Sequence, residues 1–159
     1  MRKILFTLLL IATSVSAFAQ FEQGKKYASA SLTGFDMSYS KRTEFALGLN
    51  LQAGYFIQQD WMVLGEFGMD YSHSDFNSIY VGAKGRYYME ENGLYLGFGA
   101  KYVHEFKSMN DVELTPEVGY SFFLNRYVTI EPSVYCDMSL TDFANKSKVG
   151  VKIGLGFYF

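Results

Sequence analysis

The last eleven residues of the chain, Val149 to Phe159 (VGVKIGLGFYF), decide the fold. Every second position carries valine, isoleucine, leucine or phenylalanine, whereas the positions between them carry glycine, Lys152 and Tyr158. Successive side chains of a β-strand point to opposite faces, so one face of this segment is wholly apolar and the other is not. Its length is that of a strand that crosses a membrane at a tilt. The segment therefore predicts a membrane-spanning strand at the end of the chain.

Seven further segments with the same alternation precede it, which makes eight predicted strands. They lie at about 26–34, 44–57, 61–71, 78–89, 94–103, 112–123, 127–138 and 149–159. Connections after the second, fourth and sixth are short, and Asn92-Gly93 favours a tight hairpin. Connections after the first, third, fifth and seventh are longer and polar, at about 35–43, 72–77, 104–111 and 139–147. This pattern predicts an all-β fold, an eight-stranded antiparallel up-and-down transmembrane β-barrel with its short turns in the periplasm.

The N-terminus has the composition of an export signal. Arg2 and Lys3 precede an apolar run over 4–11 that is too short to span a bilayer, and Ala17-Phe18-Ala19 fits a cleavage site. We therefore predict a signal peptide at 1–19 and a barrel domain at 20–159, which begins with a periplasmic lead-in over 20–25. Removing two basic residues changes the formal charge from −2 to −2 − 2 = −4. That charge argues against a nucleic-acid partner.

Aromatic residues make up 18% of the chain and fall into two bands. One band lies near the short turns and comprises Tyr55, Trp61, Tyr87, Tyr120, Phe122, Tyr127 and Phe157. The other lies near the longer loops and comprises Phe35, Phe45, Tyr71, Tyr102, Phe106 and Phe143. Amphipathic rings prefer the two interfaces of a bilayer, so the bands predict two aromatic girdles.

Three motifs carry a resemblance to a known family: Gly54-Tyr55-Phe56-Ile57, Pro116-Glu117-Val118-Gly119-Tyr120 and the closing Gly154 to Phe159. With them the chain resembles the porin-family small outer-membrane β-barrels, of the type of outer membrane proteins X and W and the barrel of outer membrane protein A. The resemblance implies an outer-membrane location, with membrane lipid and lipopolysaccharide as partners. It also implies that the barrel assembly machinery recognises the closing strand through Phe157 and Phe159. No cofactor is expected.

Two features depart from the simple pattern. Pro116 and Pro132 fall inside strands, where proline removes a ladder hydrogen bond, and we predict a β-bulge at each. Met62 and Leu64 fall on the inward face of their strand, so part of the interior is predicted to be apolar.

The inward positions also collect opposite charges: Glu66, Lys84, Arg86, Lys101, Glu113, Glu117, Glu131 and Lys152. Charges are strongly unfavourable on a lipid face and normal in a barrel interior. An eight-stranded barrel is only wide enough for its own side chains. We therefore expect ion pairs between neighbouring strands to plug the interior, with a structural or passive envelope role. The alternative is a narrow channel for ions or small solutes, lined by the same residues.

A third hypothesis places a surface-binding site or a lipid-modifying enzyme at the loop rim. His73-Ser74-Asp75, and His104 with Asp111, are residue types that suit nucleophilic catalysis. Contiguous residues of an extended chain point apart, however, so we predict no catalytic site and no enzyme. The two histidines are far apart in sequence and Cys136 lies on the lipid face, so no metal site is predicted. Rim cations could bind lipopolysaccharide phosphates or simply be solvated: Lys41, Arg42, Lys107, Lys146 and Lys148.

A soluble barrel that binds a small ligand is the competing fold. It requires apolar side chains inside and polar ones outside. The closing strand would then place Lys152 inside and expose Val151, Ile153, Leu155 and Phe157 to water. The membrane fold avoids that exposure, and we prefer it.

Overall fold

The computed structural model describes residues 21–38, 43–44, 46–72, 75–89, 92–106, 110–141, 143 and 147–159. These residues form eight long strands: β1 (Lys26–Ser38), β3 (Ala46–Gln58), β4 (Trp61–Ser72), β5 (Asp75–Tyr88), β6 (Leu94–Glu105), β7 (Asp111–Tyr120), β9 (Val128–Ser139) and β10 (Lys148–Tyr158). Two strands of two residues each, β2 (Thr43–Glu44) and β8 (Phe122–Phe123), complete the set. None of the described segments is a helix long and apolar enough to cross a membrane.

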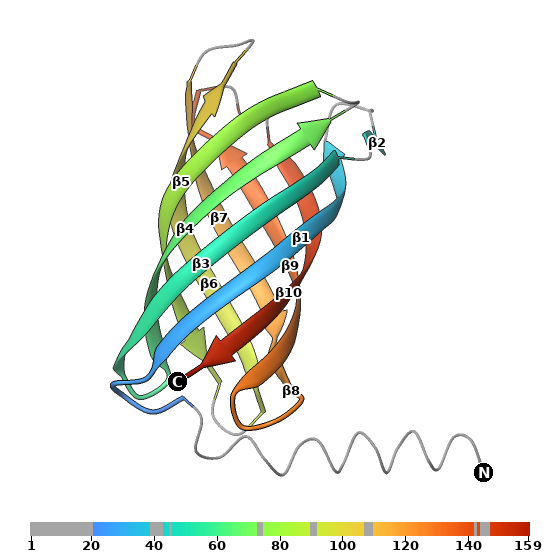
Figure 1. Cartoon of the computed structure of the whole chain (residues 1–159). Helices are drawn as coiled ribbons and strands as arrows, with labels where there is room; N and C mark the ends of the chain where they lie inside the picture. The colour runs from blue at the N-terminus through green and yellow to red at the C-terminus, as the bar shows by residue number, and fades with distance from the viewer. Residues whose placement is uncertain are drawn as a thin grey trace, which may run out of the picture.

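The strands form one closed antiparallel barrel (Figure 1). Each long strand pairs with the long strands before and after it in sequence, and β10 pairs with both β9 and β1, which closes the sheet. The short strand β8 pairs with β9 at the end of the barrel where the C-terminus lies, whereas β2 pairs with β1 at the opposite end. We call these the short-turn end and the long-loop end. The predicted fold class is confirmed.

Alternation between two environments explains why these segments are strands. Along β10, the exposed side chains Val151, Ile153 and Leu155 alternate with buried positions that include Lys152 and Tyr158. The exposed face is apolar and the buried face is polar, which is the reverse of a soluble ligand-binding barrel. Six described aromatic residues of the two bands are exposed on strands: Tyr55, Trp61, Tyr71, Tyr102, Phe122 and Phe157. Three more are exposed in the connections: Phe106, Tyr127 and Phe143. The placement of Phe45 lies outside the described residues.

The prediction of β-bulges at the two prolines is wrong. Pro116 pairs with Phe98 of β6 and Pro132 with Ile153 of β10, and neither ladder shifts register there. The β7–β9 ladder loses pairings at both prolines but keeps its register from Glu113↔Ser139 to Gly119↔Ser133. A missing N–H removes a hydrogen bond without requiring an extra residue. The register shifts instead fall between Thr33 and Phe35, Phe56 and Gln58, and Asp70 and Tyr71.

Glycine residues allow one tight turn and the close packing of tyrosine rings inside the barrel. Gly93, after Asn92, has φ of 73°, a conformation that glycine adopts without steric cost, and it connects β5 to β6. Inside the barrel, tyrosine rings lie over glycines of neighbouring strands: a Cβ at Gly68 would clash with the Tyr80 ring, and one at Gly119 with the Tyr95 ring. Met62 and Leu64 are buried inside, which confirms the partly apolar interior.

Candidate functional site

The interior of the barrel is the candidate functional site. All eight sequence-predicted charged residues are buried there. Their ion pairs divide them into two groups. In the group toward the long-loop end, Lys101 pairs with Glu113. In the inner group, Glu117 pairs with Lys84, Lys152 and Arg86, while Lys84 also pairs with Glu66 and Arg86 with Glu131. An aromatic cluster follows at the short-turn end.

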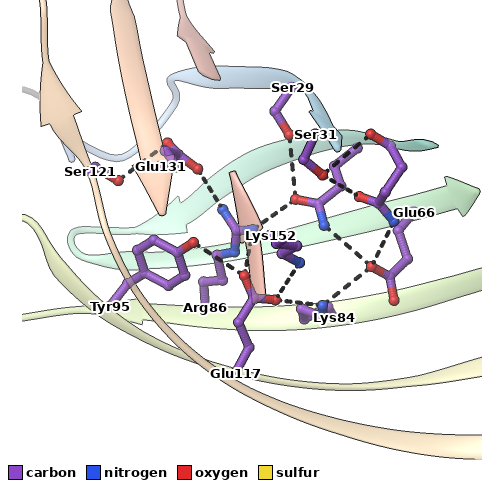
Figure 2. Close-up of polar contacts among 12 residues, drawn as sticks. Ser29, Ser31, Glu66, Lys84, Arg86, Tyr95, Glu117, Ser121, Glu131 and Lys152 are labelled. Carbon is purple, nitrogen blue, oxygen red and sulfur yellow. Dashed lines mark hydrogen bonds and ion pairs between the residues drawn. The ribbon is translucent and has the colours of Figure 1, made fainter. Parts of the chain in front are cut away.

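Arg86 is the centre of the inner group (Figure 2). Its Nη2 atom donates to Gln52 Oε1 at 2.7 Å and Glu117 Oε1 at 3.2 Å. Its Nη1 atom donates to Tyr27 Oη at 3.0 Å and Glu131 Oε2 at 3.2 Å. These acceptors come from β3, β7, β1 and β9, so one planar guanidinium joins strands from all around the barrel.

Aromatic rings complete the surroundings of this guanidinium. The Arg86 Cζ atom lies 4.4 Å from the centre of the Tyr95 ring and 5.5 Å from that of Tyr27. Such contacts stabilise a cation that has left water. The Tyr95 hydroxyl also donates to Glu117 Oε1 at 3.1 Å.

Among the described carboxylates, Glu117 makes the most ion pairs. Its Oε2 atom lies 2.6 Å from Lys84 Nζ and 2.9 Å from Lys152 Nζ, and its Oε1 atom lies 3.2 Å from Arg86 Nη2. Its side chain is fully buried. A carboxylate that has left water needs several partners. The free-energy cost of removing its charge from water exceeds the free energy gained from any single good contact.

Glu131 has a different set of partners from those expected. Sequence adjacency of strands pairs it with Lys152, but the register places Lys152 opposite Ser133 and Glu131 opposite Gly154, two residues nearer the short-turn end. At that level Glu131 accepts hydrogen bonds from Tyr27 at 2.6 Å, Tyr158 at 2.8 Å, Thr129 at 2.8 Å and Ser121 at 3.2 Å. It pairs with Arg86 across the barrel instead.

A second group of charges lies toward the long-loop end. Lys101 Nζ lies 2.7 Å from Asp137 Oδ2 and 3.1 Å from Glu113 Oε2. Thr115 donates to the other oxygen of Asp137 at 2.8 Å, and Lys148 Nζ lies 3.6 Å from Asp70 Oδ2. A small hollow lies between the two groups and is lined by members of both, including Lys84, Lys101, Asp137 and Lys152.

Sequence reasoning missed several members of the interior. Asp137 lies on the same strand face as Glu131, so alternation alone could have found it. Tyr27 and Gln52 also lie at inward positions, but the absence of charge on these side chains hid their role as partners of Arg86. Pairing across the barrel depends on the position of each residue along the barrel axis, and the alternation of the sequence does not give that position.

The rim residues do not come together as a catalytic site in the described part of the chain. His104 is exposed, and its Nδ1 atom lies 2.6 Å from Asn110 Oδ1. Asp111 is buried on the opposite side of the wall. Residues 73–74 and the rim cations 41, 42, 107 and 146 lie outside the described residues, and the side chain of Lys148 reaches into the barrel. No group of three described His, Cys, Asp or Glu side chains is arranged to hold a metal ion.

Solved structures with the same architecture include small outer-membrane barrels. The N-terminal barrel domain of Pseudomonas aeruginosa OprF is 14% identical, covers 86% of this chain and 98% of its own, and superposes with a TM-score of 0.66. Neisserial surface protein A is 15% identical over 86% and 98%, with a TM-score of 0.63. Ail of Yersinia pestis is 20% identical over 86% and 99%, with a TM-score of 0.55.

At these identities the likeness concerns the fold. No protein with a curated description matches the sequence. The sequence profile of the family described as "Outer membrane protein beta-barrel domain" matches residues 5–159, which is nearly the whole chain. Together with the closed barrel and its apolar outer face, this match identifies the protein: it belongs to the outer membrane protein β-barrel domain family.

Proposed function

We propose that this protein is a non-enzymatic, structural component of the outer membrane whose barrel is closed by its own ion pairs. The observation that carries the proposal is the group around Arg86, in which the side chains of Arg86, Glu117 and Glu131 expose 3% of their surface or less. Arg86 on β5 meets its hydrogen-bond acceptors from four other strands at this level, which leaves little room for a solute. A closed interior suits a role in envelope integrity.

The same contacts support the non-enzymatic part of the proposal. Nucleophilic catalysis needs a base within hydrogen-bond reach of a nucleophile, and an approach for the substrate. The buried carboxylates of the interior are instead held by cations and hydroxyls. His104 is bonded to Asn110 on the outside of the wall.

A narrow channel is the second candidate, and the hollow toward the long-loop end favours it. Its lining includes Glu66, Lys101, Asp137 and Lys152, so ions could enter from that side. In this alternative the Arg86 group would open for passage, while in the first proposal it stays closed.

Planar-bilayer conductance of the refolded chain without residues 1–19 tests the proposal. Folding is first verified by the shift in gel mobility on heating. A folded protein without conductance supports the closed barrel. Discrete conductance steps that change in Glu117→Gln or Lys101→Met would overturn it and establish the channel.

We further propose partners that follow from the outer surface. The exposed apolar side chains of the strands would contact lipid acyl chains, with lipopolysaccharide at the long-loop end. The closing strand, with Phe157 and Phe159, would be recognised by the barrel assembly machinery. Export through a signal peptide cleaved after Ala19 stays a prediction, because residues 1–20 lie outside the described part of the chain.

A further inference from the structure

A cup of aromatic side chains surrounds the short-turn mouth of the barrel. Phe56 of β3, Tyr88 of β5, Phe123 of β8 and Tyr158 of β10 are all buried there. The cup has an apolar side and a polar side. Tyr88 Oη and Tyr158 Oη lie 3.2 Å apart, and Tyr158 reaches Glu131, so the hydroxyls belong to the polar interior. The aromatic rings of the cup form an apolar layer on the short-turn side of these hydroxyls.

Phe21 occupies the cup although it lies before the first strand. Its ring stacks on Tyr88 at 4.2 Å between centres. It also contacts Phe123 at 5.6 Å, Tyr158 at 5.9 Å and Phe56 at 6.0 Å. One side chain thus touches rings from four strands and is 6% exposed itself.

A tight turn returns the chain to place Phe21 there. Lys25 N donates to Glu22 O at 3.3 Å, and Gly24 at the third position of this turn has φ of 94°. That conformation is the one a type II turn requires at this position, and glycine adopts it without strain. A Cβ at Gly24 would make only an ordinary contact with Tyr55 Oη at 3.8 Å, so the backbone angle is what demands glycine.

Backbone hydrogen bonds fasten the turn to the barrel. Gly24 N donates to Phe56 O at 2.9 Å, and Asp60 N donates to Phe21 O at 3.0 Å. Asp60 has φ of 62°, and its own carbonyl accepts from Tyr88 N at 2.8 Å. The β3–β4 turn therefore holds both the N-terminal segment and the strand that carries Tyr88.

We propose that residues 21–25 form an N-terminal cork that closes the periplasmic mouth of the barrel, with the aromatic cup as the binding site for Phe21. The cork is a second barrier, in series with the Arg86 group. The proposal of a cork can be tested separately from the proposed function. The cork is tested by the accessibility of the mouth to a reagent, and the ion-pair plug is tested by conductance. The interior above the cork is then a chamber that opens only toward the long loops.

Ser121 is the natural reporter position for a test. It is buried, and its Oγ atom lies 3.3 Å from Tyr158 Oη on the interior side of the cup. The reporter protein carries Ser121→Cys together with Cys136→Ser, refolded in micelles, and the labelling rate with a water-soluble maleimide is measured. Adding Phe21→Ala should raise the rate by at least about tenfold, because local opening controls access. Phe21→Leu, which still fills the cup, should restore most of the protection.

Glu22→Ala is the matched control, since it alters an exposed neighbour in the same turn. Equal rates with and without Phe21→Ala, or the same increase in Glu22→Ala, would overturn the cork. A second measurement does not depend on the alanine variant. In a Trp61→Phe, Phe21→Trp protein, the single tryptophan should emit as a buried residue and resist acrylamide quenching; emission and quenching typical of exposed tryptophan would also overturn the proposal.

Discussion

Glu117 shows how the interior depends on single residues. It faces Lys84, Lys152 and Arg86 at the same time, so replacing its charge leaves three buried cations with one carboxylate fewer. We expect Glu117→Gln to lower the free energy of unfolding by roughly 3–5 kcal/mol. Urea unfolding in lipid vesicles, followed by Trp61 fluorescence, measures this. Glu22→Gln is the control at an exposed position, and equal stability of the two variants would contradict the importance of these pairs.

Arg86 tests geometry rather than charge. Its two terminal nitrogens reach four acceptors on four strands, and a lysine ammonium cannot span them from one point. Arg86→Lys should therefore destabilise the barrel by roughly 1–3 kcal/mol although the charge is kept. Arg126→Lys, in the exposed turn before β9, should be neutral in the same unfolding experiment. If both variants behave like the parent protein, the guanidinium contributes only its charge.

Within a strand, small residues make room for the tyrosine rings of the interior. In β4, a Cβ at Gly68 would lie 2.2 Å from Tyr80 Cζ, whereas at Gly65 the nearest atom, Gly82 O, is 3.9 Å away. Gly68→Ala should cost roughly 1–3 kcal/mol of unfolding free energy, because the Tyr80 ring must shift in a packed interior. Gly65→Ala, three residues earlier in the same strand, should be near neutral. A similar loss in both would show that strand flexibility, and not ring packing, sets the stability.

The strands were predictable because each side chain faces one of two very different environments. The alternating pattern ends near the long loops, but strand pairing continues beyond it. For this reason β1 extends to Ser38 instead of about 34, and β5 begins at Asp75 instead of about 78. The prolines were misread for a related reason. Sequence shows the missing donor but not whether the ladder keeps its register around it.

At the scale of the molecule, the sequence shows whether a side chain faces the interior or the lipid better than it shows where the side chain lies along the barrel axis. It predicted eight of the charged residues that point inward, but it missed Asp137, the contact of Arg86 with Glu131 across the barrel and the place of Phe21 at the mouth. Both contacts join segments far apart in sequence, and the turn at Gly24 is the one local signal for the second. These contacts can form only when the strands have come together into the barrel. Closure of the strands is therefore a central step in folding.

Phe159 takes part in the seam that closes the barrel. Phe159 N donates to Lys26 O at 3.0 Å and Phe159 O accepts from Lys26 N at 2.7 Å, so the end of the chain completes the seam between β10 and β1. Deleting Phe159 removes both hydrogen bonds and the terminal ring. We expect the deletion to lower the amount of heat-modifiable protein in the outer membrane, and Phe159→Tyr, which keeps both features, to restore it.

Refolding of the same proteins into lipid vesicles separates two causes of that loss. If the deletion variant refolds normally in vitro but fails in cells, the terminal ring acts through recognition by the assembly machinery. If refolding is also impaired, the contacts of Phe159 within the barrel, which include the two hydrogen bonds of the seam, explain the defect without recognition. Normal outer-membrane levels of the deletion variant would contradict both explanations, because the barrel would then close and be recognised without its final residue.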